Sequence, residues 1–198
     1  MPETGNTNPM RVLLVDSEPG RAAILEQALV DAGHLVVKRT DRAQPLASMV
    51  AESQPDMVII DIDAPDRDVL EQMSHVSRDN PKPIVMYADQ DDASYVEAAI
   101  RSGVSAYVAN GMRPERVKST MAVAIARFQE FQALRQELDE ARLELADRKI
   151  IEKAKGLIMT HRGVSEDSAY QALRKMAMDR SSRLVEVARN VISVFDIL

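Results

Sequence analysis

The chain has 198 residues, enough for one sizeable core and a smaller unit at roughly 100 to 200 residues per domain. It contains no cysteine, which excludes a disulfide framework, a thiolate metal site and a cysteine nucleophile. No apolar run reaches the roughly 18 to 20 residues that cross a bilayer, and the polar start MPETGNTNP is unlike a signal peptide, so we expect a cytoplasmic protein without membrane contact.

The net charge of −6 is unevenly distributed along the chain. Residues 1–147 carry 15 Lys and Arg against 25 Asp and Glu, a net charge of −10, whereas residues 148–198 carry 10 against 6, a net charge of +4. A basic end on an acidic chain indicates contact with a polyanion at that end. Ordinary fluctuation over a short segment is the alternative.

Five short apolar runs rich in Val and Ile alternate with stretches of helical spacing. This alternation predicts β–α–β units and a parallel sheet that is buried on both faces. Gly33 and Gly103 stand where helices should stop before the next strand. We therefore predict an α/β domain with a doubly wound five-stranded parallel sheet over residues 10–125, after a flexible tail at 1–9. The strands are expected at residues 11–15, 34–38, 56–60, 82–87 and 105–109.

A helix of more than 40 residues is predicted to follow, with Pro114 in its first turn. Its apolar residues recur in steps of three and four, with one phase slip, and acidic and basic residues border them. The pattern predicts a coiled coil over residues 114–147 that forms a homodimer, and a single amphipathic helix lying on its own domain is the alternative. The residues predicted to form the dimer contact are Phe128, Phe131, Leu134, Leu138 and Leu145.

Residues 140–198 predict an all-α module of three helices, the first of them continuous with the coiled coil. Ser165 is expected to cap the second helix, and Ser181 or Ser182 the third.

Lys149, Lys153 and Gly156 share one stripe of the first of these helices, because they are spaced by four and three. A glycine inside a helix costs about 1 kcal/mol against alanine, which is tolerable where another backbone comes close. That backbone could belong to a nucleic acid or to a tightly packed neighbouring helix, and the sequence leaves both interpretations open.

Carboxylates gather where the predicted strands end. Asp16 ends the first strand and Asp61 the third, and the carboxyl ends of parallel strands meet at one edge of a sheet. Two or three oxygen ligands and water can hold Mg²⁺, and a carboxylate beside such an ion can form an acyl phosphate. Acidic residues that merely cap strands and turns are an equal alternative. No nucleophile, base and orienting group accompany the carboxylates, so we do not expect an enzyme.

Residues 11 to about 125 resemble the receiver domain of two-component response regulators. VDSEP stands where that family has its acidic pair, and DIDAP stands where it has the phosphoacceptor Asp followed by Pro. The resemblance implies that Asp61 is the phosphoacceptor, that Asp16, Asp61 and the backbone carbonyl of Asp63 are metal ligands, and that Tyr107 is the aromatic switch residue.

Three positions depart from the receiver pattern. Ser17 replaces the second acidic residue, Ala88 stands where a hydroxyl is usual, and Asn110 replaces the Lys of the last strand-end loop. A positioned Lys or hydroxyl stabilises phosphoryl oxygens, so we expect a pseudo-receiver whose phosphoacceptor position is weak or inactive. No cofactor is required, metal binding is expected to be weak or absent, and Mg²⁺ could still enter the pocket with Glu18 as a substitute ligand.

IIEKAKGLIM, followed by GVSEDSAYQALRKMA and LVEVA, resembles the ANTAR domain, the three-helix RNA-binding output of antiterminators. Receiver, coiled coil and ANTAR in this order resemble the AmiR/NasT class of transcription antitermination regulators, and DAPDRDVLE and GVSAYVANG favour the nitrate-assimilation NasT branch. The resemblance implies binding to paired hairpins in a nascent mRNA leader, with control by a ligand-sensing partner protein more than by phosphorylation. The residues predicted to contact RNA are Lys149, Lys153, Lys155, Gly156, Arg174 and Lys175.

A phosphorylation-controlled DNA-binding response regulator is the alternative, because three helices also suit a helix-turn-helix reader. Its third helix would offer Arg183, Arg189 and Asn190. A protein that only titrates a partner is a further class. Tyr170 and Phe195 are the aromatic residues of the basic end, so base stacking on RNA would fall to Arg or apolar side chains.

Overall fold

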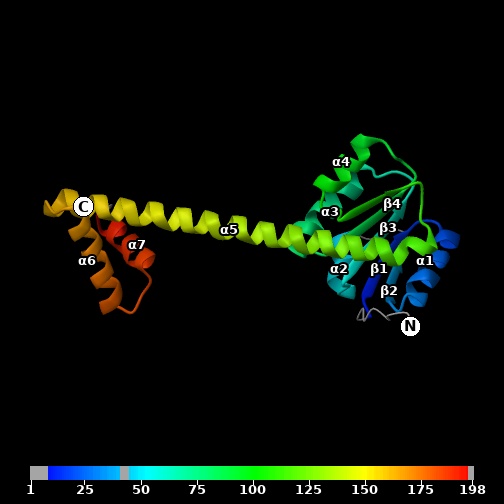
Figure 1. The fold of residues 1–198 in the computed structure, drawn as a ribbon, viewed down its shortest axis with the longest axis horizontal. Helices are drawn as coiled ribbons and strands as arrows, with labels where there is room; N and C mark the ends of the chain where they lie inside the picture. Colours follow the sequence, from blue (N-terminus) through cyan, green and yellow to red (C-terminus); the bar gives the residue numbers. More distant parts are fainter. Residues whose placement is uncertain (1–8, 41–44, 196–198) are drawn as a thin grey trace, which may run out of the picture. The chain divides into compact units, whose positions relative to one another are not determined.

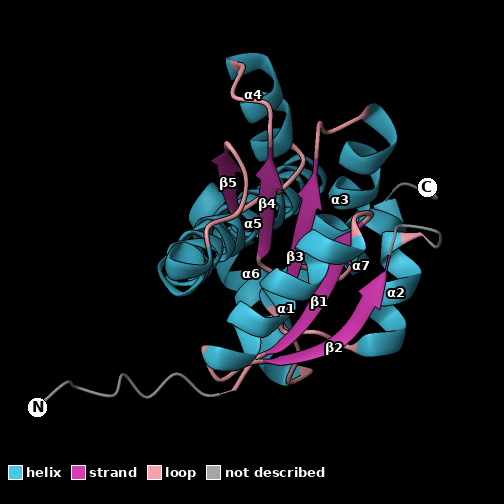
Figure 2. Ribbon diagram, turned by 90° about the vertical axis from the view of Figure 1, so that its right-hand side faces the viewer, coloured by secondary structure: helices cyan, strands magenta, loops and turns pink. Residues whose placement is uncertain are grey.

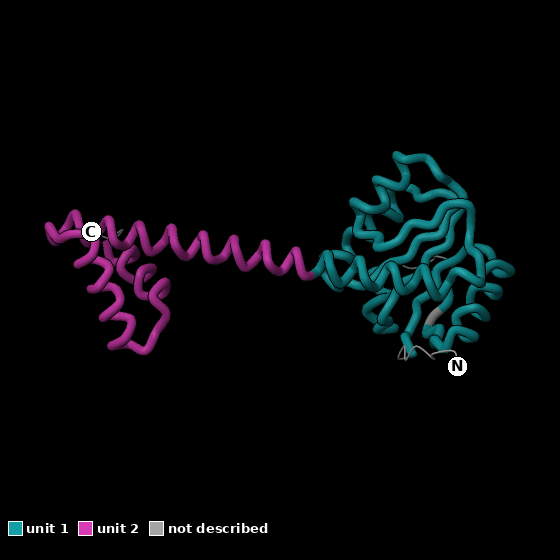
Figure 3. The backbone as a smooth tube through the Cα atoms, in the orientation of Figure 1, with its two compact units in different colours: residues 1–132 teal, residues 133–198 magenta. Residues whose placement is uncertain are grey.

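The computed structural model describes residues 9–40 and 45–195, and Figure 1 follows them along the chain. The tail predicted at residues 1–9 lies outside the described residues except for Pro9. The chain divides into two compact units, residues 1–132 and residues 133–198, which Figure 3 distinguishes by colour. Each unit is considered by itself below.

The first unit is built on a five-stranded sheet in the order β2-β1-β3-β4-β5, with every neighbouring pair parallel (Figure 2). This is the sheet that the alternating apolar runs predict, so the expected fold class is confirmed. The strands are β1 (Arg11–Asp16), β2 (Leu35–Thr40), β3 (Met57–Ile62), β4 (Ile84–Ala88) and β5 (Ala106–Ala109).

Helices cover both faces of the sheet, because successive strand side chains point to opposite faces and each face needs an apolar partner. One core cluster joins α1 (Pro19–Asp31) and the first turns of α5 (Val117–Arg162) to the sheet. The other joins α2 (Leu46–Ser53), α3 (Arg67–Asp79) and α4 (Ala93–Arg101) to the opposite face. Each fully buried Leu or Ile in these clusters contributes about 1.5–3 kcal/mol.

Helix ends follow local chemistry in the first unit. Gly33 after α1 and Gly103 after α4 have φ values of 88° and 95°, as expected of glycines that terminate helices. Asp66 and Asp92 cap α3 and α4 by accepting hydrogen bonds from the backbone amides of Val69 and Ser94.

The long helix α5 has 46 residues and follows a 3₁₀ turn, η1, at Pro114–Arg116. It passes through Gly156 without a break, which confirms that the first helix of the basic end continues the long helix. Phe131, Leu134, Leu138 and Leu145 are 50 to 59% exposed. Phe128 is half-buried.

The second unit packs the end of α5 against α6 (Glu166–Asp179) and α7 (Leu184–Phe195). Its core is rich in alanine, which lets helices approach closely. The fully or nearly buried members are Ala154, Ile158, Ala169, Leu173, Ala177, Val187 and Ala188.

One of the two predicted helix caps in this unit is confirmed. The Ser165 hydroxyl accepts a hydrogen bond from the Ser168 amide at 3.3 Å, so Ser165 caps α6. The cap predicted at Ser181 or Ser182 is wrong, because the Ser182 amide donates to the Ala177 carbonyl and still belongs to the end of α6. Helix α7 begins only at Leu184.

None of the helices in the described ranges combines the length and apolar character that crossing a membrane requires.

Candidate functional sites

An acidic pocket lies at the carboxyl end of the sheet in the first unit. Asp16 on β1 is in register with Asp61 on β3, and Asp61 is in register with Tyr87 on β4. The residues two positions earlier on these strands belong to the core cluster under α1 and α5, so this row faces the same side. The side chains of Asp16 and Asp61 are 0% and 2% exposed.

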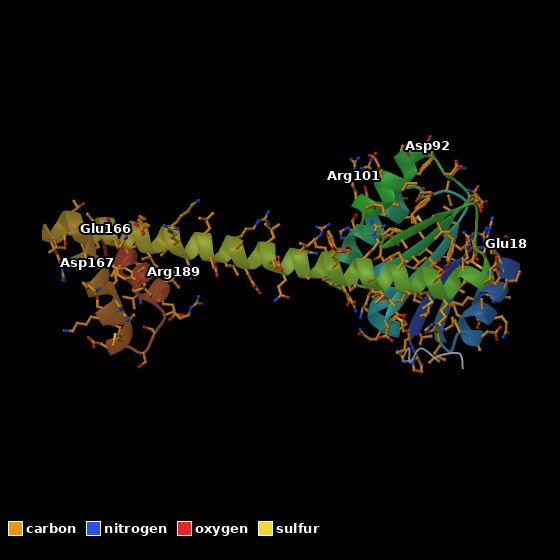
Figure 4. All side chains as sticks on the ribbon, in the orientation of Figure 1. Glu18, Asp92, Arg101, Glu166, Asp167 and Arg189 are labelled. Atoms are coloured by element: carbon orange, nitrogen blue, oxygen red, sulfur yellow. The ribbon has the colours of Figure 1, made fainter. Side chains whose placement is uncertain are left out.

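A guanidinium group fills the space between these carboxylates. Arg21, in the first turn of α1, directs Nη2 to Oδ1 of Asp16 at 3.1 Å and Nε to Oδ2 of Asp16 at 3.2 Å. The same Nε lies 3.3 Å from Oδ1 of Asp61. Nη1 lies 3.4 Å from Oδ1 of Asp63 and 3.7 Å from Oε2 of Glu18, which Figure 4 labels near the start of α1. One cation therefore contacts four carboxylates.

Burial dominates the ionisation of the predicted phosphoacceptor. Removal from water raises the pKa of Asp61 to about 7, and the Arg21 charge opposes this rise only in part, while the nearby Asp16, Asp89 and Asp63 add to it. Oδ2 of Asp61 is buried without a hydrogen-bond partner in the part of the chain that the structure describes. The pKa of Arg21 is raised, mainly by its hydrogen bond to Asp16.

The hydroxyl position predicted at Ala88 is wrong. Ala88 is in register with Ile62, and alternate residues of a strand point to opposite faces, so its side chain lies on the other side of the sheet from Asp61. Tyr87 occupies the position that faces Asp61. The phosphoacceptor position therefore faces a bulky phenol where the resemblance leads one to expect a small hydroxyl.

The remaining receiver positions are also placed by the structure. Asn110 is exposed in the loop after β5 with a φ of 62°, a conformation that suits asparagine. The backbone carbonyl of Asp63, expected to be a metal ligand, accepts a hydrogen bond from the Asp89 amide at 3.2 Å. Tyr107 donates its hydroxyl to the Gln90 carbonyl at 2.7 Å.

The residues as placed do not fit the magnesium ion that the receiver resemblance suggests. Over residues 9–40 and 45–195, no three His, Asp or Glu side chains lie where they could hold a metal ion together. The carboxylate oxygens of the pocket instead face Arg21. The sequence did not single out this residue, and the available signal was a basic side chain in the first helical turn after a strand that ends in Asp.

A second candidate site lies between α5 and α7 in the second unit. It is a groove of about 520 Å³ lined by Lys149, Lys153 and Arg189, the last of them labelled in Figure 4. Nη2 of Arg189 also lies 3.4 Å from Oδ1 of Asp147. Ile150 and Ile192 form its apolar floor. The sequence indicates Arg189 only as a DNA-reading residue of the alternative function. Its position in the same groove as Lys149 depends on how α7 packs against α5, which the sequence does not show.

Lys155 does not share this surface, contrary to its prediction as an RNA contact. Its side chain is only 9% exposed, and Nζ lies 2.8 Å from Oε1 of Glu152 and 2.7 Å from Oε1 of Glu166. These hydrogen bonds raise the pKa of Lys155. Lys155 therefore has a structural role, because its ion pair with Glu166 links α5 to α6.

Gly156 is exposed, and a Cβ atom built on it would meet nothing within 4 Å. The interpretation that it permits tight packing of helix on helix is therefore wrong. Arg174 and Lys175 are exposed on α6 but do not line the groove. The ring of Phe195 stacks on His161 with centroids 4.4 Å apart.

Comparisons with known proteins agree with this division. The response regulator receiver domain family matches residues 12–122, more than half of the chain, and the ANTAR domain family matches residues 139–192. The chain thus belongs to the response regulator receiver family. With its ANTAR domain it is a response regulator of the AmiR/NasT type, which confirms the resemblance seen in the sequence.

Two curated relatives illustrate the match. The transcriptional regulatory protein PdtaR of Mycobacterium tuberculosis is 29% identical over 184 residues, which cover 93% of this chain and 90% of PdtaR. The nitrate regulatory protein of Klebsiella oxytoca is 49% identical over 65 residues, which cover 33% of this chain and only 16% of that protein. The second match gives weak support to the nitrate-assimilation assignment.

Solved structures show the fold of the first unit. The receiver domain of a modulated diguanylate cyclase from Desulfovibrio desulfuricans has a TM-score of 0.54 at 20% identity and covers 62% of this chain and 98% of that one. The receiver domain of the NarL regulator from Mycobacterium tuberculosis has a TM-score of 0.53 at 20% identity, with 60% and 98% covered.

Proposed function

We propose that this protein is a transcription antitermination regulator. Its ANTAR domain binds paired hairpins in nascent mRNA leaders and prevents the terminator from forming. The observation that supports this function best is the groove between α5 and α7, where Lys149, Lys153 and Arg189 surround an apolar floor. RNA loops offer unstacked bases together with phosphates, and a groove with a basic rim and an apolar floor suits both.

The RNA contact is centred on the groove. Lys149 and Lys153 project from successive turns of one face of α5, and Gly156 continues that face with open space above its backbone. A phosphate backbone can therefore approach α5 at Gly156 after passing the two lysines. Arg174 and Lys175 on α6 provide further exposed positive charge for a longer RNA.

Two copies of the chain are proposed to pair through α5 within residues 114–147. Phe131, Leu134, Leu138 and Leu145 are at least half exposed and lie on one side of the helix. Apolar residues sustained at this spacing over several turns are typical of coiled coils. A dimer would present two ANTAR domains, which suits an RNA that carries two hairpins.

Control is proposed to act through the receiver domain by a ligand-sensing partner protein. The acidic pocket lacks the second carboxylate at Ser17 and the lysine at Asn110, and Tyr87 faces the phosphoacceptor position. A phosphoryl group on Asp61 would find little of the charge neutralisation that it needs. Docking of a partner on the acidic receiver does not depend on that chemistry.

The full-length protein should be crosslinked to nucleic acid in cells, and the bound molecules sequenced. We expect RNA leaders with paired hairpins upstream of a terminator. Affinity is then measured on a synthetic RNA with two short hairpins, for wild type, Lys149→Ala, Lys153→Ala and Arg189→Ala.

Each groove variant should bind the two-hairpin RNA roughly tenfold more weakly and with a shallower salt dependence. Arg180→Ala is the matched control, because Arg180 is exposed in the same unit and does not line the groove. Unchanged affinity in all three groove variants would place the RNA elsewhere. Recovery of duplex DNA alone would favour the DNA-binding alternative.

A further inference from the structure

We propose that the guanidinium of Arg21 is the resident cation of the acidic pocket and excludes a divalent metal ion from it. This inference concerns the receiver domain and does not depend on RNA binding.

The buried carboxylates of the pocket favour a cation between them. Asp16 and Asp61 are adjacent in register, and each has a side chain that is at most 2% exposed. Two carboxylates at such close range repel each other, and burying a charged group without a partner is costly. Glu18 and Asp63 add negative charge at the rim.

Arg21 meets this need through the shape of its head group. Its Nε and Nη2 atoms approach the two oxygens of Asp16 at 3.2 and 3.1 Å, which is the paired geometry that a planar guanidinium makes with a carboxylate. Nε also lies 3.3 Å from Oδ1 of Asp61, and Nη1 lies 3.4 Å from Oδ1 of Asp63. A fixed fork of donors suits several carboxylates at once better than the single ammonium of lysine does.

A metal ion does not fit beside this group. Mg²⁺ requires near-octahedral oxygen ligands at about 2.0–2.1 Å. Both oxygens of Asp16 and Oδ1 of Asp61 face the Arg21 nitrogens, and the backbone carbonyl of Asp63 accepts a hydrogen bond from the Asp89 amide. Oδ2 of Asp61 is the one oxygen of this group that is left over, and a single carboxylate oxygen does not make a magnesium site. Two cations on the same carboxylates would also repel each other strongly where water is scarce. Ser17 stands in place of the second acidic residue, and the nearby Glu18 carboxylate lies 3.7 Å from Arg21 Nη1 at the rim.

The consequence is a receiver pocket that is complete without an ion. Divalent metal ions should therefore not change the stability of the folded receiver domain, because Arg21 already holds the carboxylates. Removing Arg21 leaves buried carboxylates in need of a cation, and an added metal can then supply it.

The test uses Mn²⁺ as the probe, because the free ion is quantified by electron paramagnetic resonance. Full-length Arg21→Gln should bind Mn²⁺ at least about tenfold more tightly than full-length wild type does. Arg101→Gln is the control, since Arg101 makes a surface ion pair with Glu97 in the same unit and is labelled in Figure 4. Equal Mn²⁺ binding by wild type and Arg21→Gln would overturn the proposal.

Thermal unfolding in EDTA and in Mg²⁺ gives a second measurement, and its wild-type result does not depend on whether Arg21→Gln folds well. Wild type and Arg21→Lys both retain a cation, so their Tm values should not change with Mg²⁺. Arg21→Gln should have a lower Tm in EDTA and regain part of the loss in Mg²⁺. A wild-type Tm that rises with Mg²⁺ would show that Arg21 does not hold the site.

Discussion

The Nζ atom of Lys155 on α5 lies 2.7 Å from Oε1 of Glu166 on α6. Glu166 stands in the first turn of α6, where the helix dipole also favours a carboxylate. The pKa of Glu166 is lowered, mainly by the hydrogen bond from Lys155. This contact therefore stabilises the packing of α6 on α5 at neutral pH.

Loss of the Lys155 ammonium should loosen α6 without removing an RNA contact. We expect Lys155→Met to increase hydrogen exchange in α6 several-fold at pH 7, because Glu166 loses its partner. Lys149→Ala should leave exchange in α6 unchanged and weaken RNA binding instead.

The pH dependence of exchange has a fixed sign for this pair. Since the pKa of Glu166 is depressed in the folded state, its contribution to stability is present above the ordinary carboxyl pKa and is lost as the pH falls through the lowered value. Wild type and Glu166→Gln should therefore converge in acid. If they differ equally at pH 7 and in acid, the contact is not ionic.

The sequence was sufficient for the sheet and for several helix ends. Continuous apolar runs at Val12–Val15 and Val58–Ile60 are expected only of strands that are buried on both faces, and the structure buries these runs. Gly33, Gly103 and Ser165 ended or began helices as predicted, because these signals are local. The start of α7 was missed, since Ser182 remains bonded to the end of α6.

The site residues that were missed or misplaced depend on contacts between elements. Arg21 enters the pocket only because α1 packs with that face toward β1 and β3. The choice between Tyr87 and Ala88 rests on strand register, in which an error of one residue reverses the face. Lys155 was assigned to the surface, although it lies four residues after Ile151 and three before Ile158 and thus on the apolar side.

The exposed apolar stripe on α5 consists of Phe131, Leu134, Leu138 and Leu145. If it forms the proposed dimer contact, one charged side chain placed in it should abolish the dimer. In Leu138→Asp, a carboxylate replaces a side chain that is 50% exposed and would be covered in a coiled coil. The variant should sediment as a monomer at concentrations where wild type is dimeric.

Leu143→Asp is the matched control for this experiment. Leu143 is 66% exposed on the same helix but lies on a different side of it from Leu134, Leu138 and Leu145. Its substitution should leave the dimer intact. Equal dissociation by both aspartates, or by neither, would argue against the proposed stripe.

Alanine substitutions at Gly103 and Gly33 should differ in their effect on the free energy of unfolding, because only one of these glycines has a close neighbour. Gly103 has a φ of 95°, and a Cβ atom on it would overlap the Ser77 side chain on α3. Gly33 has a similar φ of 88°, but a Cβ there would meet nothing within 4 Å. Gly103→Ala combines backbone strain with a steric clash, whereas Gly33→Ala has the strain alone.

We expect Gly103→Ala to lower the free energy of unfolding by about 2–4 kcal/mol and Gly33→Ala by about 1 kcal/mol. Urea unfolding followed by tyrosine fluorescence in a Tyr170→Phe background reports on the first unit, since the other tyrosines, Tyr87, Tyr95 and Tyr107, all lie there. Equal losses in the two variants would mean that the Ser77 contact relaxes at no cost.

The raised pKa of Asp61 predicts that the receiver loses stability as the pH rises. In the unfolded chain this carboxyl has its ordinary pKa of 3.8, and in the folded chain the pKa is about 7 because burial disfavours the charge. Between these values the folded state holds a proton that the unfolded state has released. Stability therefore falls as the pH rises from about 4 to about 7, and is unaffected by this group outside that window.

Asp61→Asn removes this titration and keeps the shape of the side chain. Relative to wild type, the variant should gain roughly 2–4 kcal/mol in its free energy of unfolding between pH 4 and pH 8. Asp92→Asn is the contrasting control, because the pKa of Asp92 is lowered by its hydrogen bonds with Ser94 and its contribution is lost toward acid. A difference between Asp61→Asn and wild type that is the same at pH 5 and pH 8 would show that Asp61 stays ionised beside Arg21, with the guanidinium outweighing the burial.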